Sequence, residues 1–534
     1  MTGDLFTLEL TFVGLLLLVS VVAMIVHRIR IPYTVALVLV GLALSFQKGI
    51  HFELTPELIL SLFLPPLVFE AALHIDYRIF RKIVTPVLLL AVFGVLIAVV
   101  VISGLLTATG MMDWRTSLVF ASLIAATDPV AVVSLFKVLG APKRLATLVE
   151  SESLFNDATT IVVFHIVVGA LTMGGAKLQL DWLQAAEQFA LVAAGGVVVG
   201  ILAGLVANLI FAHVNDHLIE ITLSTIAVYG TYLLAEQFHL SGVLAVVLTG
   251  MIIGNRSSRN MSPTTRMMLM NFWEYIAFLA NSLIFILIGM QVVLPHIGDN
   301  SYLLFGLVVV IVLISRAITV YGLSFVSRLL GNRVQYAYQH VMFWGGLRGA
   351  VSLALALSIG RTFPHRDLIL TLTFVVVFFT LLVQATTISP LLRKLGLVGL
   401  SDTERAYEFL HGRLLASWAA YAKLKREYED GALDPAAWNA VKEELSERIQ
   451  ALNLQLSDFA EANPELISGI TAATRREALH IQRASIIDMQ REGVLSDEVA
   501  RGLIAEIDES IDALIQPHSL AAEAVDQAAS PQAA

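Results

Sequence analysis

The sequence contains no cysteine, which excludes disulfides, thiolate metal sites and cysteine nucleophiles. Charged residues are also scarce: they make up 14% of the 534 residues, against 57% in the hydrophobic set. No basic patch of the kind that binds nucleic acid is visible, so we expect no nucleic-acid partner. The mean hydropathy of +0.78 lies far above that of soluble globular domains. The composition therefore predicts a protein that sits mostly in a lipid bilayer.

Long apolar runs alternate with short polar segments over most of the chain. The first ten residues carry no basic residue, unlike a cleaved signal peptide, so we expect the first run to be a true span. A bilayer core needs about 20 mainly apolar residues per helix, or fewer where a helix is broken. Thirteen segments fit, which predicts an all-α polytopic membrane protein. They lie near residues 8–26, 32–46, 57–73, 86–108, 116–136, 145–171, 185–211, 218–235, 240–254, 267–290, 301–322, 340–359 and 367–392.

Basic residues are shared unequally between the two sets of loops that these spans create. Fifteen Lys and Arg residues fall on one side, while the other side has five, namely Lys48, Arg115, Lys177, Arg361 and Arg366. An excess of Lys and Arg in short loops marks the cytoplasmic side. With an odd number of spans, the N-terminus is then outside and the C-terminus cytoplasmic. We expect a multi-pass protein of a bacterial inner membrane.

The composition changes after the last predicted span. Residues 1–400 hold 22 Lys and Arg against 19 Asp and Glu, whereas the remainder holds 12 against 24. We therefore predict a transmembrane domain over residues 1–395, a cytosolic helical domain over 396–515 and a disordered tail over 516–534, which is rich in Ala, Ser, Gln and Pro. The acidic domain could bind a regulator or its dimer mate, and a solvated domain without a ligand is the alternative.

A few ionisable residues fall inside predicted spans, where each charge needs a partner or a function. Asp128 lies near the middle of the fifth span. Pro129 follows it directly, and a proline disfavours helix at the preceding residue, so the backbone should open there and free the Thr127 carbonyl. Open backbone at this depth must face protein or water. The alternative is a simple kink with a hydrogen-bonded acid.

The sixth span carries the string Glu152-Ser-Leu-Phe-Asn-Asp157. Ser153 and Asp157 are four residues apart and so share one helix face, while Glu152 and Asn156 share the adjoining stripe. The first face offers a hydroxyl and a carboxylate, which are oxygen ligands suited to a hard cation. A polar network that serves only helix packing is the alternative.

Two further charges lie close to helix-disrupting residues. Glu70 follows Pro65 and Pro66 and is either a buried site carboxylate or a side chain that reaches the interface. Arg348 lies in a glycine-rich stretch of the twelfth span and needs a fixed carboxylate, for which we expect Glu152. The fifth and twelfth spans each combine a disruption with a charge, as in inverted repeats whose broken helices meet at a binding site. Arg316, His165 and Glu274 are expected to be packing or interface residues.

Five strings, LPPLVFEAAL, TDPVAVV, ESLFND, NSLIFILIG and GGLRGAVSLALAL, occur in this order. Together they resemble the NhaP-type bacterial sodium/proton antiporters of the monovalent cation/proton antiporter superfamily, over roughly residues 8–395. The resemblance implies a homodimer in which a mobile core domain moves against a dimerisation domain, and in which the fifth and twelfth helices are broken and cross. It also implies ion ligands at Asp157, Asp128, Ser153, Glu70 and the Thr127 carbonyl, with Glu152 and Arg348 as a stabilising pair.

The resemblance also implies an activity. The pair Asn156-Asp157 is similar to that of the electroneutral branch, where electrogenic relatives have two aspartates. Burial disfavours an ionised carboxylate and a bound cation favours it, so sodium and protons should compete for one site. We expect Asp157 to be the main proton-exchanging group, with Asp128 as co-ligand, in a transporter that needs no cofactor and serves pH homeostasis. A K⁺/H⁺ antiporter on the same fold is one alternative, and an intramembrane aspartyl protease, whose Gly-x-Gly-Asp context is absent, is another.

Overall fold

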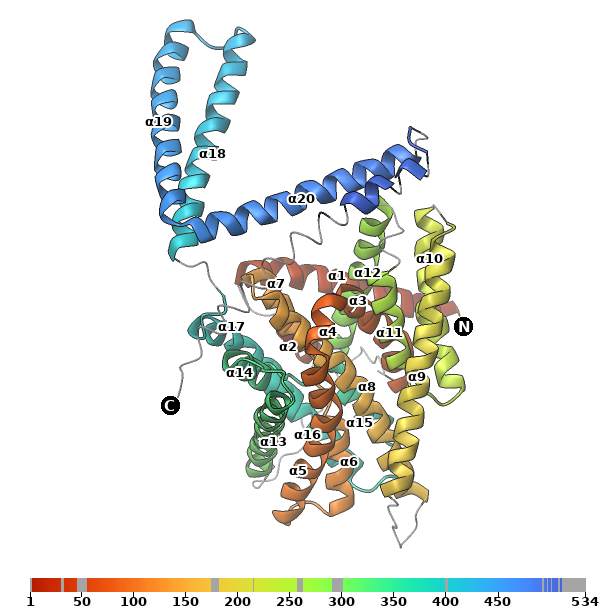
Figure 1. Cartoon of the computed structure of the whole chain (residues 1–534). Coiled ribbons are helices and arrows are strands. Elements are labelled where there is room, and N and C mark those ends of the chain that lie inside the picture. The colour runs from red at the N-terminus through yellow and green to blue at the C-terminus, as the bar shows by residue number, and fades with distance from the viewer. Residues whose placement is uncertain are drawn as a thin grey trace. The chain divides into compact units, whose positions relative to one another are not determined.

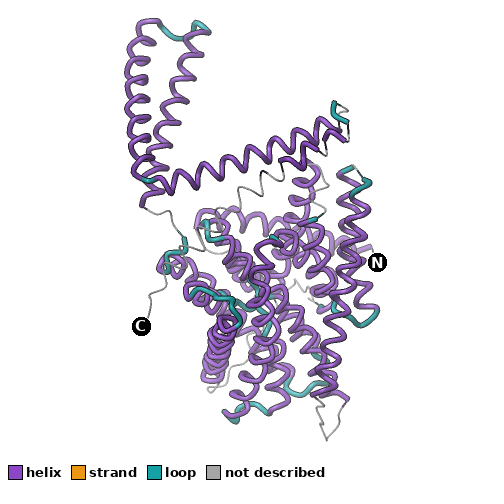
Figure 2. Tube along the Cα trace, viewed as in Figure 1, coloured by secondary structure: helices purple, strands orange, loops and turns teal. Residues whose placement is uncertain are grey.

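The computed structural model describes residues 2–29, 33–45, 55–173, 182–214, 216–256, 263–290, 301–398 and 402–491, together with 494–496, 498–500, 502–507 and 510 (Figure 1). Within these residues the regular structure is helical (Figure 2), apart from one isolated antiparallel bridge between Asp128 and Leu347. The chain divides into two compact units, Met1–Val398 and Gly399–Ala534. The all-α prediction is confirmed.

The first unit contains the apolar helices. Its elements are α1 (Thr2–Ile29), α2 (Tyr33–Ser45), η1 (Leu58–Phe63), α3 (Leu64–His74), α4 (Tyr77–Leu88), η2 (Leu89–Phe93), α5 (Gly94–Ala108), α6 (Trp114–Ile124), α7 (Val130–Leu139), α8 (Lys143–Met173), α9 (Trp182–Phe211), α10 (His217–Gln237), α11 (Gly242–Asn255), α12 (Pro263–Met290), α13 (Ser301–Leu329), α14 (Tyr336–Trp344), α15 (Ala350–Ser358), α16 (Arg366–Phe379), η4 (Thr380–Gln384) and α17 (Ala385–Lys394), where η marks a π-helical turn. Among the described residues, seven helices are long and apolar enough to cross a membrane by length and composition, and shorter apolar helices accompany them. The count of thirteen spans stays a prediction.

Three of the predicted spans differ from the observed helices, because two are broken and one is longer. The fifth and twelfth spans are each two short helices, α6 with α7 and α14 with α15. The fourth is longer than predicted, because α4, η2 and α5 form one continuous helix from Tyr77 to Ala108. Pro86 lies inside it, and the π-helical turn begins three residues later. A proline removes one backbone donor, which a wider turn accommodates without breaking the helix.

Glycines bring several helices of the first unit into close contact. Helices α2 and α12 cross at Gly41 and Gly289, and a Cβ atom added at Gly41 would collide with the carbonyl oxygen of Ile286. In the same way, Gly200 of α9 lies against Ala245 of α11. Small residues at a crossing let helix backbones approach within a membrane, where apolar burial between helices provides no driving force. Helices α2, α3, α9, α11 and α12 therefore form one closely packed group.

A second group surrounds the two broken helices. Helix α8 packs against α4, η2 and α6, and α13 packs against α5 and α16. Helix α15, the second half of the twelfth predicted span, packs against α6 and α16. This packing places both breaks beside α8, which carries the predicted site residues of the sixth span.

The second unit contains a helical hairpin. Its helices are α18 (Asp402–Glu429), α19 (Pro435–Ala462) and α20 (Pro464–Arg491). Leu414 of α18 packs with Ile449 and Leu452 of α19 in a small apolar core. The Asp434 carboxylate accepts the first free N–H groups of α19, which fixes the start of that helix. These residues are helical, as predicted, while the predicted disordered tail over 516–534 lies outside the described residues.

Candidate ion-binding site

The two broken helices meet at their breaks. Helix α6 ends at Ile124 and α7 begins at Val130, while α14 ends at Trp344 and α15 begins at Ala350. The extended segments between them lie antiparallel, and the Asp128 N–H donates a hydrogen bond to the Leu347 carbonyl oxygen at 2.8 Å. This bond satisfies a donor that would otherwise be orphaned at the break. The predicted opening before Pro129 and the crossing of the two helices are both confirmed.

The carboxylate of Asp128 is fixed within this crossing. Its Oδ1 accepts the Val130 N–H at 3.0 Å, so it satisfies a free donor at the start of α7. A Cβ atom added at Gly349, on the opposite segment, would collide with this carboxylate. The absence of a side chain at position 349 therefore makes room for the acid.

Helix α8 faces the break with its polar stripe. The Ser153 hydroxyl donates to the Thr127 carbonyl oxygen, and Nδ2 of Asn156 donates to the Thr127 hydroxyl at 3.2 Å and to Glu152 Oε1 at 3.3 Å. The Thr160 hydroxyl completes this network by donating to Oδ1 of Asn156 at 3.1 Å. Both ends of the Asn156 amide are thus engaged, and this side chain orders the site.

Asp157 offers an unused ligand atom to the site. Its Oδ1 is buried and has no hydrogen-bond partner among the described residues. The charges of Asp128, Glu152 and Arg348 all act on its carboxyl group, and the Thr127 backbone N–H faces it. The structure therefore brings Asp157, Asp128, Thr127 and Ser153 together at the crossing, as the sequence predicts.

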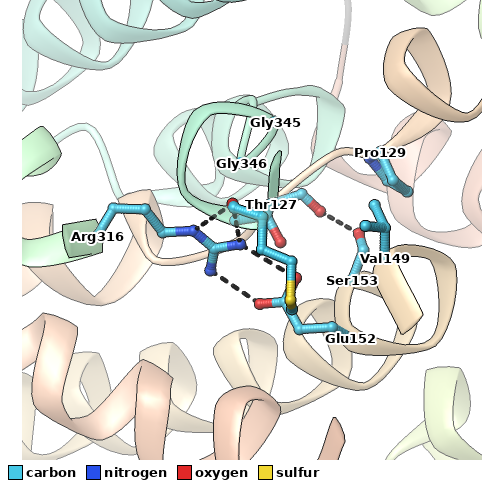
Figure 3. A pocket seen from close by; sticks show the side chains of 9 residues that line it. Thr127, Pro129, Val149, Glu152, Ser153, Arg316, Gly345 and Gly346 are labelled. Carbon is cyan, nitrogen blue, oxygen red and sulfur yellow. Dashed lines mark hydrogen bonds and ion pairs between the residues drawn. The ribbon is translucent and has the colours of Figure 1, made fainter. Parts of the chain in front are cut away.

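The buried ion pair of the site differs from the predicted one. Glu152 pairs with Arg316 of α13, not with Arg348: the Arg316 NH1 group lies 2.8 Å from Oε1 and NH2 lies 3.2 Å from Oε2 (Figure 3). Nε and NH2 of Arg316 also donate to the Met342 carbonyl oxygen in the last turn of α14. Arg316, expected to be a packing or interface residue, is thus the partner of Glu152, and its guanidinium connects α13, α8 and α14.

Arg348 has other partners. Its NH1 group donates to the carbonyl oxygens of Ala125 and Ala126, at 2.6 and 2.8 Å. These carbonyls follow the last residue of α6, where a helix carries unpaired acceptors and partial negative charge. The prediction of a Glu152–Arg348 pair was wrong. Arg348 lies in the open segment between α14 and α15, and its side chain is taken up by the carbonyl oxygens at the end of α6. The sequence does show that Arg316 lies inside an apolar span, where it needs a buried partner. It does not show which of the two arginines pairs with Glu152.

Glu70 contacts His74 in the described structure. Its Oε1 is 3.3 Å from Nδ1 of His74, one turn further along α3, and the charges of Lys137 and Glu274 act on it. No hydrogen bond or ion pair joins it to Ser153 or Asp157 within the described ranges. The predicted role of Glu70 as an ion ligand stays a prediction.

A small cavity opens beside the crossing (Figure 3). Its volume is about 10 Å³, which is room for about one water molecule. The lining includes Thr127, Pro129, Glu152, Ser153 and Arg316. In the part of the chain that is described, no three His, Cys, Asp or Glu side chains gather to hold a metal ion. A cation here would depend on carbonyl and hydroxyl oxygens as well as carboxylates.

Two discontinuous helices whose breaks meet beside buried carboxylates are the arrangement that secondary transporters use for their ion sites. The model of the family described as "Sodium/hydrogen exchanger, transmembrane" matches residues 14–394. The chain is 36% identical over 476 residues to the low-affinity Na⁺/H⁺ antiporter NhaS1 of Synechocystis sp., covering 88% of this chain and 90% of that protein. It is also 36% identical over 474 residues to the Na⁺/H⁺ antiporter ApNhaP of Aphanothece halophytica, with 88% and 90% covered.

The fold is similar to a solved structure as well. The sodium/proton antiporter MjNhaP1 from Methanocaldococcus jannaschii matches with a TM-score of 0.60 at 21% identity, covering 73% of this chain and 99% of that one. This protein belongs to the sodium/hydrogen exchanger family, with the NhaP-type antiporters among its relatives. Membership makes the chain a membrane-embedded transporter, not an enzyme, so the protease alternative falls away.

Proposed function

We propose that this protein exchanges Na⁺ for H⁺ across the membrane by alternating access. The observation that supports this most is the Asp157 carboxyl group, whose buried Oδ1 has no hydrogen-bond partner among the described residues. It lies at the crossing of two broken helices, where the Asp128 carboxylate, the Thr127 carbonyl and the Ser153 hydroxyl supply further oxygen atoms. Oxygen ligands of this kind suit a hard cation such as Na⁺.

Competition between the two ions follows from electrostatics. An ionised carboxylate that is buried has lost hydration, so it binds either a proton or a cation in preference to remaining bare. When Na⁺ enters, its charge favours the ionised form and the proton leaves. If the bare charged site cannot readily change its access, each movement carries one ion or the other, which makes the exchange obligatory.

The ligand set we propose is Asp157, Asp128, Ser153 and the Thr127 carbonyl, with Glu70 joining in another conformation. The Ser153 hydroxyl is bonded to the Thr127 carbonyl in the present arrangement. A Na⁺ ion bound between them replaces this bond, after which both oxygen atoms point at the ion. Glu70 must turn from His74 toward the crossing to contribute.

The proposal extends to stoichiometry, topology and assembly. The Asn156-Asp157 pair resembles that of the electroneutral branch and the Asn156 amide is engaged at both ends, which supports electroneutral exchange. The distribution of basic residues supports an orientation with the N-terminus outside and the acidic C-terminal domain in the cytoplasm, and a bacterial inner membrane is proposed on the resemblance. A homodimer is proposed on the resemblance described above, and a regulator of the acidic domain is proposed on its charge.

Reconstitution tests the proposed activity. The purified protein is placed in proteoliposomes with an internal pH dye, and Na⁺, Li⁺ or K⁺ is added outside, with and without an imposed membrane voltage. We expect pH recovery with Na⁺ that does not depend on voltage. A response to K⁺ alone would establish the K⁺/H⁺ alternative, and silence with all three ions would refute the proposal.

The role of Asp157 is tested separately. Asp157→Asn removes the exchangeable proton while keeping the shape of the side chain, so we expect exchange to be abolished. Glu187→Gln, which alters an exposed acid on α9, is the matched control and should transport normally. Wild-type exchange by Asp157→Asn would transfer the proton-exchanging role to another carboxylate.

A further inference from the structure

A buried threonine far from the ion ligands in sequence holds the second broken helix in place. Thr380 begins the π-helical turn η4, in the long helix that runs from Arg366 to Lys394. Its hydroxyl donates to the Val377 carbonyl oxygen at 3.0 Å and accepts the Arg348 N–H at 3.1 Å. Only 2% of its surface is exposed. Both functions of this hydroxyl are therefore used, and its proton has a fixed direction.

The Arg348 N–H needs such an acceptor from outside its own helix. Arg348 lies between the end of α14 and the start of α15, where the helical pattern of hydrogen bonds is interrupted. A buried backbone donor without a partner is strongly unfavourable, and water is scarce at a buried crossing. Thr380 supplies the missing acceptor across a helix–helix contact.

Arg348 also contacts the first broken helix, through its side chain. The Arg348 guanidinium donates to the Ala125 and Ala126 carbonyl oxygens, immediately before Thr127 and Asp128. Its positive charge and the charge of Asp157 act on each other. A displacement of the Arg348 backbone therefore shifts the segment that carries the Thr127 carbonyl. It also shifts the positively charged guanidinium that faces the site carboxylates.

We propose that Thr380 is a positioning residue of the ion site: by fixing the Arg348 backbone, it sets the apparent sodium affinity of the exchanger. The inference rests on the proposed Na⁺/H⁺ exchange. Thr380 touches no transported ion, and its effect passes through Arg348. A π-helical turn at this point is in keeping with such a role, because these turns are frequent at functional sites.

The same helix provides a matched control. Thr373 is fully buried, and the hydrogen bond of its hydroxyl goes to the Ile369 carbonyl oxygen of its own helix, at 2.7 Å. Thr373→Val and Thr380→Val each remove one buried hydroxyl from one helix with little change in shape. The Thr380 change alone removes the acceptor of the Arg348 N–H.

The test compares Thr380→Val, Thr380→Ser and Thr373→Val in proteoliposomes, with the amount of folded protein measured for each. We expect Thr380→Val to raise the apparent KM for Na⁺ on the order of fivefold, the factor that one lost hydrogen bond of average strength produces. The maximal rate should change less, and the pH profile should shift. Thr380→Ser keeps the acceptor and should restore the wild-type KM, and Thr373→Val should leave the KM unchanged.

Hydrogen exchange at the Arg348 amide provides a readout that does not depend on transport, and it should accelerate in Thr380→Val alone. If Thr380→Val does not fold, Thr380→Ala replaces it with the same expectation. An active wild type with unchanged KM and pH profile in these variants would overturn the role of Thr380, as would an equal rise in KM in Thr373→Val. A wild type without any exchange would instead refute the proposed function.

Discussion

Removing Arg316 should destabilise the membrane unit strongly. Arg316→Met takes two charge-assisted hydrogen bonds from Glu152 and two donors from the Met342 carbonyl oxygen. The two side chains of the pair are only 8% and 3% exposed, so bulk water does not reach the place of the lost partner. Breaking a buried ion pair by removing one partner costs about 3–5 kcal/mol, because a charge is left buried and uncompensated. We expect a loss of this size in the free energy of unfolding.

A double-mutant cycle isolates the pair. The variants are Arg316→Met, Glu152→Gln and the double change, measured by chemical unfolding in mixed detergent micelles. The double variant buries no net charge at this place, so it should be more stable than the sum of the two single losses, with a coupling energy of about 1–3 kcal/mol. Arg328→Met, which removes an exposed arginine from the same helix, is the control and should have little effect.

The same cycle distinguishes the two buried arginines. Glu152→Gln should couple strongly to Arg316→Met and only weakly to Arg348→Met, since Arg348 donates to backbone carbonyls. Additive losses for Glu152 and Arg316, or stronger coupling of Glu152 to Arg348, would refute the pairing seen in the structure and reinstate the pair expected from the sequence.

Two further changes test other parts of the site region. Gly349→Ala places a Cβ atom against the Asp128 carboxylate, so it should raise the KM for Na⁺ in the vesicle assay, whereas Gly360→Ala, which has open space around it, should transport normally. Asp113→Ala removes the cap of α6 and should cost about 1 kcal/mol at neutral pH. Burial alone would raise the pKa of Asp113, but hydrogen bonds from Thr116 outweigh it and hold the pKa below its usual value. Its contribution is therefore complete above the ordinary Asp pKa of about 3.9 and is lost as the pH falls through the lowered value, so the wild-type and Asp113→Ala unfolding curves should converge in acid; a constant difference would contradict this.

Local rules predict the opening before Pro129 and a disturbed helix around Arg348, whereas the crossing of the two broken helices was an expectation from the resemblance. A proline after Asp128 and three glycines around Arg348 disturb a helix by local rules, which need no knowledge of the partners. The shared face of Ser153 and Asp157 follows equally from helix geometry. For these reasons the residues that meet at the crossing, Asp128, Ser153 and Asp157, could be predicted from the sequence.

The choice between the two arginines could not be predicted in this way. Arg316 and Arg348 are both buried and both need acceptors, and which one reaches Glu152 depends on how α13 packs beside α8. The contact between Thr380 and Arg348 was missed for the same reason, because it joins residues 32 positions apart through tertiary packing. Long-range side-chain partners were thus the part that local patterns left undetermined.

The guanidinium of Arg316 has a consequence for how the site can change its access. It joins the middle of α13 to Glu152 on α8 and to the last turn of α14. Because these groups are buried, separating any two of the three helices would leave a polar group without a partner. Sliding α8 past α14 would break these bonds together. Opening toward either side of the membrane is therefore expected to carry these three helices as one rigid piece, so that Ser153 and Asp157 of α8 keep their places relative to α13 and α14.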